Sequence, residues 1–260
     1  NTRDCIGRAL TLTVSSGRGA HYVDFVKTAR QILLSTSMTV ELWMNPTRQA
    51  GSKVFVAGLW GPGNDDNDQW VLYFDANDNL VFEINGTGPK LRAVDNTILS
   101  IPGSSLYNKW SHIAAVFNGQ NQRIYLYIDG VAVDSARNAT YPATQLRPLE
   151  RPELLTQIAS TNSLSDNASN RTFRGQIDEF RMWNTVRTPT QILCTRDLSL
   201  NGNEAGLILY YRFNEQPSNF TLCDASNGNS TGRARSGASC QNNTRTSLLR
   251  VSAIPTQVRD

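Results

Sequence analysis

The stretch from Trp110 to Asp134, WSHIAAVFNGQNQRIYLYIDGVAVD, decides the fold class. Within it, Trp110–Phe117 and Arg123–Ile128 are rich in β-branched and aromatic residues, and Asn118–Gln122 separates them, which is the pattern of a β-hairpin. Asp129-Gly130 follows directly, and an Asp-Gly pair between two apolar runs favours a two-residue type I′ turn. The stretch therefore predicts three consecutive antiparallel strands.

Strand patterns extend along the chain on both sides of this stretch. Thr39–Met44 alternates, so that Val40, Leu42 and Met44 share one face while Glu41 and Trp43 share the other. Further strands are expected at Ala9–Val14, Tyr22–Phe25, Lys53–Leu59, Trp70–Phe74, Leu80–Ile84, Leu154–Ser160, Phe173–Trp183 and Gly206–Phe213.

One helix is expected, at Thr188–Arg196, because Thr188 can cap it and Pro189 suits its first position. All-β sandwiches often reach this length as one domain, and the chain has no Pro-rich or Ser-rich linker. We therefore predict one all-β domain over residues 1–260, with about twelve to fourteen strands. Its core would cover about residues 8–237 and would carry extended terminal tails.

Charge and hydropathy exclude two classes of partner. The net charge is only +3, and the basic residues are scattered, whereas nucleic-acid binding needs a dense basic stripe. No run of 18 apolar residues is present, so we expect no membrane span. A thin cluster of arginines remains, which is either a solvated face or a contact for an anionic glycan: Arg233, Arg235, Arg245 and Arg250.

Cysteines and sequons indicate an extracellular protein. The even set of four cysteines contains no C-x-x-C pair, so two disulfides are expected rather than a zinc site. Three pairings are open, and we favour Cys5 with Cys240 and Cys194 with Cys223. N-x-[ST] sequons predict a secreted glycoprotein with glycans at Asn85, Asn138, Asn167, Asn170, Asn219, Asn229 and Asn242.

Several motifs, taken in order, resemble laminin-G-like and pentraxin-like domains of the concanavalin A-like superfamily. They are Ala9–Leu12, His21–Val23, Met38–Met44, Lys109–Phe117, Ile124–Gly130, Phe173–Asn184 and Gly206–Asn214. The resemblance spans nearly the whole chain and implies an antiparallel two-sheet jelly roll. It does not fix a function, because this fold carries lectins, adhesion modules and hydrolases.

Catalysis is not expected from these residues. Related β-glucanases use an E-x-D-x-x-E strand, whereas the matching segment here is Gln176–Arg181, without the flanking glutamates. Asp178 and Glu179 are adjacent, so they should point to opposite faces, and with Arg181 they should form structural hydrogen bonds and ion pairs. His112 has no paired nucleophile and is expected to be structural as well.

The loop Gly61–Gln69 contains the candidate binding residues. Its crowded carboxylate and amide oxygens are the ligands that calcium prefers, which makes it either a Ca²⁺ site or a solvated acidic loop. Trp60 precedes it and could stack on a sugar, although most of the tryptophans are expected in the core. The candidate calcium ligands are Asn64, Asp65, Asp66 and Asp68.

Two functions remain open. The first is a non-enzymatic module for extracellular recognition or cell adhesion, which holds a glycan or a protein in loops at one end of the sandwich. The alternative is a structural subunit of an extracellular homo-oligomer or filament, assembled through Asn1–Gly7 and Leu248–Asp260, because an exposed strand can join a neighbour's sheet. A glycoside hydrolase comes third.

Overall fold

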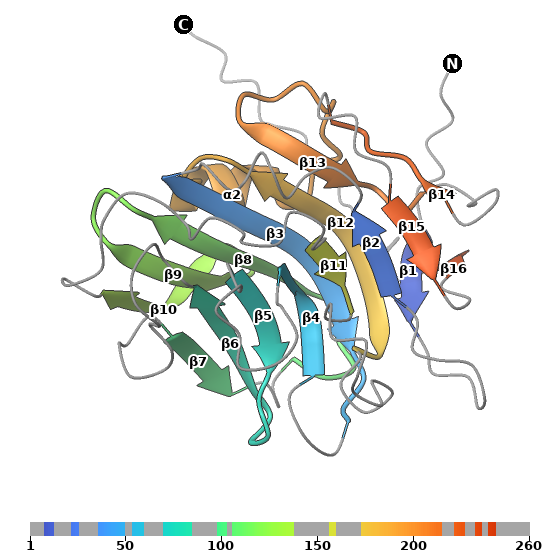
Figure 1. Cartoon of the computed structure of the whole chain (residues 1–260), viewed down its shortest axis with the longest axis horizontal. Coiled ribbons are helices and arrows are strands. Elements are labelled where there is room, and N and C mark those ends of the chain that lie inside the picture. Colours follow the sequence, from blue (N-terminus) through green and yellow to red (C-terminus); the bar gives the residue numbers. More distant parts are fainter. Residues whose placement is uncertain are drawn as a thin grey trace, which may run out of the picture.

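The chain folds into two packed antiparallel sheets. The computed structural model describes residues 8–12, 22–25, 36–49, 54–59, 70–84, 98–102, 106–137, 156–159, 173–214, 221–226, 232–235 and 239–242. Within them, one eight-stranded sheet has the order β10-β9-β8-β3-β12-β1-β16, with β13 also pairing with β12. The second eight-stranded sheet has the order β14-β15-β2-β11-β4-β5-β6-β7, and Figure 1 shows it lying against the first. We call them the first and the second sheet.

Both sheets draw their strands from all parts of the chain. The first sheet consists of β1 (Arg8–Leu12), β3 (Ser37–Pro46), β8 (Ser111–Asn118), β9 (Arg123–Ile128), β10 (Val131–Arg137), β12 (Gly175–Trp183), β13 (Leu207–Tyr211) and β16 (Ser239–Asn242). The second consists of β2 (Tyr22–Phe25), β4 (Val54–Leu59), β5 (Trp70–Phe74), β6 (Asn79–Ile84), β7 (Ile98–Pro102), β11 (Thr156–Ile158), β14 (Thr221–Leu222) and β15 (Gly232–Arg235). The helix is α2 (Pro189–Thr195). The two-sheet sandwich with one short helix is confirmed.

The deciding stretch forms the predicted β8, β9 and β10. Phe117 lies opposite Ile124, and Ile128 lies opposite Val131, as consecutive hairpins require. Asp129 and Gly130 both have positive φ, at 51° and 82°, which is the requirement of a type I′ turn. The turn prediction is therefore confirmed.

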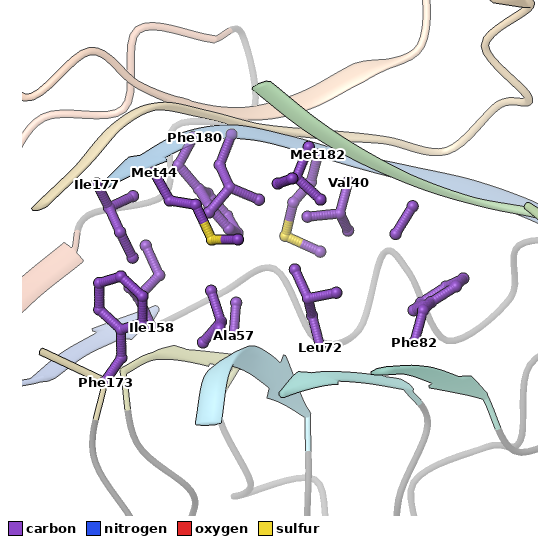
Figure 2. Packing of buried hydrophobic residues seen from close by; sticks show 14 of the residues in the cluster. Val40, Met44, Ala57, Leu72, Phe82, Ile158, Phe173, Ile177, Phe180 and Met182 are labelled. Atoms are coloured by element: carbon purple, nitrogen blue, oxygen red, sulfur yellow. The ribbon is translucent and has the colours of Figure 1, made fainter. Parts of the chain in front are cut away.

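The core lies between the two sheets. Figure 2 shows Val40, Met44 and Phe180 of the first sheet pointing toward Leu72 and Phe82 of the second. These side chains are all at most 1% exposed, so their apolar area is almost completely removed from water. Burial at about 25 cal/mol per Å² makes this layer the main stabilising contact between the sheets.

Helix α2 covers the outer face of the first sheet, the face turned away from the core. Ile192 of the helix packs on Ala114, Val116 and Tyr127, which alternate with the core residues of β8 and β9. Thr188 caps the helix, with its hydroxyl accepting from the Gln191 amide, as predicted. The part of the outer face beneath α2 is therefore a second buried layer rather than a solvent-facing one.

One prediction about β12 is wrong. Asp178 lies opposite Trp43 and Arg181 opposite Glu41, so three steps along β12 match two along β3. Glu179 takes a φ of 52° in this β-bulge. The extra residue places both Asp178 and Glu179 on the outer face, rather than on opposite faces as strict alternation requires.

Candidate functional site

A polar hollow opens on the outer face of the first sheet, where β1, β12 and β3 lie side by side. Thr11 lies opposite Gln176, and Gln176 lies opposite Asn45, so their side chains form one row across three strands. The next row inward pairs Leu10 with Ile177, whose side chains belong to the core. The floor of the hollow is thus the polar side of strands whose other side is apolar.

Loop residues form the walls. The Thr47 amide donates to the Arg174 carbonyl at 2.9 Å, and the Asn108 amide donates to the Pro46 carbonyl at 2.8 Å. Leu106 is buried in the core and anchors the turn that carries Asn108. The two bonds hold both walls against the end of β3.

The hollow has a volume of about 510 Å³, which is in the range of small-ligand pockets. Two of its polar atoms, the Thr11 hydroxyl oxygen and Arg174 Nε, are buried and have no hydrogen-bond partner among the residues that the structure describes. Buried polar atoms are normally paired, so these two are exceptions within the described part of the chain and mark a polar wall behind the surface of the hollow. The described lining residues are Thr11, Leu12, Asn45, Thr47, Asn108, Arg174, Gly175 and Gln176.

Gly175 sets the shape of the hollow. Its φ is +132°, and a Cβ there would lie 2.3 Å from the Asn45 carbonyl oxygen and 2.9 Å from Pro46 Cα. Only glycine allows β12 to approach β3 this closely in that conformation. The close approach brings Arg174 and Gln176 beside Asn45.

A second group of polar residues lies beneath α2 on the same outer face, and it is closed. Arg181 Nη2 donates to Glu179 Oε2 at 2.6 Å, and the Tyr210 hydroxyl donates to the same oxygen. Arg181 also donates to the carbonyl of Thr195, the last residue of α2, and to that of Leu198 just after it. Asp178 accepts from the Glu179 amide at 2.9 Å. The structural role expected for Asp178, Glu179 and Arg181 is confirmed.

Glu41 lies at the centre of this buried group and is 0% exposed. Arg187 Nε donates to Glu41 Oε1 at 3.2 Å, and His112 Nε2 lies 3.5 Å from Glu41 Oε2. Burial alone would raise the pKa of Glu41, but His112, Arg181 and Arg187 together hold that pKa below its ordinary value of 4.5. Glu41 is therefore a buried carboxylate surrounded by cationic side chains, and His112 is held structurally against it.

The predicted ligand residues are not part of this hollow as described. Trp60, Asn64, Asp65, Asp66 and Asp68 lie outside the described residues, so the calcium and sugar-stacking sites stay predictions. The same holds for the sequons at Asn85, Asn138, Asn167, Asn170, Asn219 and Asn229. Asn242 ends β16, the strand beside β1 at one end of the first sheet.

The favoured cysteine pairing is corrected in part. Cys194 lies in α2 as an exposed free thiol, so the structure holds no Cys194–Cys223 bridge. The reason is positional: Ile192 faces the sheet, and Cys194 is turned to solvent two residues later. Cys240 lies in β16, while Cys5 is outside the described residues, so the Cys5–Cys240 pairing stays a prediction.

Sequence reasoning missed the hollow itself. Thr11, Asn45 and Gln176 are far apart in the chain, and only the register of three strands brings them together. The one usable signal was Arg174-Gly175 at the start of a predicted strand, where a glycine marks a close approach of backbones.

A family model matches most of this chain, and curated relatives match less than half of it. A laminin-G-like family model, described as the concanavalin A-like lectin/glucanases superfamily, matches residues 18–193. Pappalysin-1 of Mus musculus is 31% identical over 102 residues and that of Homo sapiens 29% identical over 116 residues. These segments cover 39% and 45% of this chain but only 6% of either pappalysin.

Solved structures agree in fold. A putative carbohydrate binding protein from Bacteroides ovatus superposes with a TM-score of 0.67 at 18% identity, covering 92% of this chain and 60% of that one. A heptameric SAP-like pentraxin from Limulus polyphemus gives 0.61 at 13% identity, covering 94% and 98%. The CBM40 of a Ruminococcus gnavus sialidase gives 0.52 at 14% identity, covering 72% and 96%. By the family match over more than half of its length, the chain belongs to the concanavalin A-like lectin/glucanases superfamily.

Proposed function

We propose that this chain is a non-catalytic glycan-binding module that holds its ligand in the polar hollow. The observation that carries the proposal is the lining of that hollow: Asn45, Asn108 and Gln176 supply amides, Thr11 supplies a hydroxyl, and Arg174 supplies a cation. Amides donate and accept at once, as the hydroxyl groups of a sugar require. A structurally similar protein that is described as a putative carbohydrate binding protein supports this choice over a protein ligand.

A glycan array tests the proposal. Wild-type protein is compared with Asn45→Ala and Gln176→Ala, which remove amide groups from the floor of the hollow. The control is Gln120→Ala, at an exposed turn residue remote from the hollow. We expect a set of glycans whose binding falls about tenfold in the first two variants, the loss of a typical hydrogen bond, and not in the third. If all three variants bind as well as wild type, the glycan-binding site is not the hollow but another part of the molecule.

The absence of catalysis is part of the proposal and rests on the buried carboxylates. Glu41 and Glu179 are each engaged by arginine under α2, and neither is among the residues lining the hollow. Glycoside hydrolysis needs two carboxyl groups flanking the bond to be broken. Release of reducing ends from an array-identified glycan, measured over a day at high protein concentration, would contradict this part.

We further propose that the protein works outside the cell as a glycoprotein. The support is the set of sequons together with the cysteine content. Native material should lose mass when treated with an N-glycanase, as intact mass spectrometry would show. An unchanged mass would contradict the glycoprotein assignment.

The calcium loop and the filament alternative remain separate predictions. Calcium at Asp65, Asp66 and their neighbours would appear as saturable heat in a calorimetric titration of protein freed of metal, and would be lost in an Asp65→Asn, Asp68→Asn double variant. Filaments in negative-stain images of native material would favour the structural subunit over the binding module.

A further inference from the structure

We infer that the ligand of the hollow carries a carboxylate, and that Arg174 is the residue that recognises it. This inference rests on the proposed function and narrows it from glycans in general to acidic ones, such as uronic-acid oligosaccharides. Three features lead to it: the Arg174 charge has no described counter-ion, its Nε has no described hydrogen-bond partner, and its backbone is held on both sides.

The charge comes first. Arg174 is the one charged side chain among the described residues that line the hollow. Some arginines of the described chain have a carboxylate in reach, as Arg48 has Asp78, Arg181 has Glu179 and Arg187 has Glu41, whereas Arg123 and Arg212 bond to neutral oxygens. Arg174 has no such ion pair within the described part of the chain. A half-buried cation without a counter-ion leaves a positive site that an anion can neutralise.

The geometry of the guanidinium favours one kind of anion. Arg174 is half-buried and lines the hollow, and its inner Nε has no hydrogen-bond partner among the described residues. A guanidinium offers parallel N–H donors in a plane, which match the two oxygens of a carboxylate. Asn45 and Gln176 then remain for the uncharged hydroxyl groups of the same sugar.

The backbone at Arg174 is held in place on both sides. Phe173 is 1% exposed and packs in the core on one side, and Gly175 lies against β3 on the other. The Arg174 carbonyl accepts from the Thr47 amide at 2.9 Å. The backbone that carries the guanidinium is therefore fixed before binding, which lowers the entropy that a ligand contact must offset.

Paired probes test the inference. Hyaluronan, alginate and galacturonate oligosaccharides are each measured beside the same oligosaccharide after reduction of its carboxyl groups to alcohols. The proteins are wild type, Arg174→Gln, Arg174→Lys and the control Arg137→Gln. Arg137 ends β10 at the opposite side of the first sheet and is exposed, so its loss changes the net charge equally.

The expected result is a preference of at least about tenfold for the acid over its reduced form in one or more pairs. Arg174→Gln should remove that preference with an unchanged Tm, because the side chain has no hydrogen-bond or ion-pair partner among the described residues. Arg174→Lys should keep part of the preference, and Arg137→Gln should keep all of it.

Each contrary result has a distinct meaning. Equal binding of acid and reduced probes, lowered by Asn45→Ala, would overturn the inference and leave the glycan-binding function standing. If Arg137→Gln loses the preference as fully as Arg174→Gln does, the preference comes from the overall charge, and the role of Arg174 is overturned. Tighter binding of a sulfated oligosaccharide than of any carboxylate probe would overturn the carboxylate assignment. A failure to bind any glycan, neutral or acidic, would overturn both proposals.

Discussion

At the scale of single residues, Arg181 connects the first sheet to the segment that covers it. It is 0% exposed and bonds to Glu179 on its own strand and to the Thr195 and Leu198 carbonyls above. The guanidinium carbon of Arg181 also lies 5.2 Å from the centre of the Tyr210 ring. The buried charges are thus neutralised by one another, and none of them is free to reach the surface.

Replacing Arg181 with Met should therefore destabilise the protein by about 3–5 kcal/mol, because Glu179 would be left buried and charged. The double variant Arg181→Met, Glu179→Gln should recover part of that loss, and a denaturant titration measures both. Arg48→Met, which breaks an exposed pair with Asp78, serves as the control and should change the unfolding free energy little. Equal losses in the two arginine variants would show that burial does not decide the effect.

The lowered pKa of Glu41 predicts an acid-sensitive stability. A carboxylate whose folded pKa lies below its unfolded value of 4.5 stabilises the fold above that pH, and the contribution disappears as the pH falls through the folded pKa. Glu41→Gln should therefore be less stable than wild type at pH 7, and the difference should narrow as the pH falls below 4.5. Asp134→Asn, at an exposed carboxylate on β10, controls for charge. A gap that is constant from pH 7 to pH 3 would contradict the assignment.

At the scale of elements, α2 is short and depends on its cap. The Thr188 hydroxyl accepts from the Gln191 amide, and the Gln191 side chain accepts from the Thr188 amide at 2.9 Å. Thr188→Ala should cost about 1 kcal/mol in chemical denaturation, since one N-terminal donor loses its partner. Thr190→Ala, exposed on the same helix, should cost much less. Equal costs would mean that the helix is held by its contacts with the sheet alone.

The predictable elements are those whose local pattern agrees with their environment. β3 has one face in the core and one under α2, and its alternation separated Val40 from Glu41 correctly. β7 (ILSIP) was missed because its proline argues against a strand. The bulge at Glu179 was missed because a non-glycine residue with positive φ leaves no mark in the sequence. The hollow could not be predicted for the same reason: it depends on register, which long-range pairing sets.

At the scale of the whole molecule, distant parts of the chain complete one sheet. β1 pairs with β12 on one side and with β16 on the other, so strands near both ends of the chain lie beside its middle. One apolar cluster includes residues from both sheets, from Leu10 to Leu222. Such interleaving predicts that the chain behaves as a single domain, in which neither sheet can unfold alone.

This prediction can be tested with one core substitution. Leu72→Ala, in β5 of the second sheet, should cost about 2–5 kcal/mol, because it leaves a cavity against the first sheet. If the domain is single, far-UV circular dichroism and tryptophan fluorescence should report the same lowered midpoint, since Trp70 lies in the second sheet and Trp183 in the first. Leu198→Ala, at an exposed leucine, is the matched control and should leave the midpoint nearly unchanged. Two separated transitions in Leu72→Ala would mean that the sheets unfold independently, and the stability of the hollow would then depend on the first sheet alone.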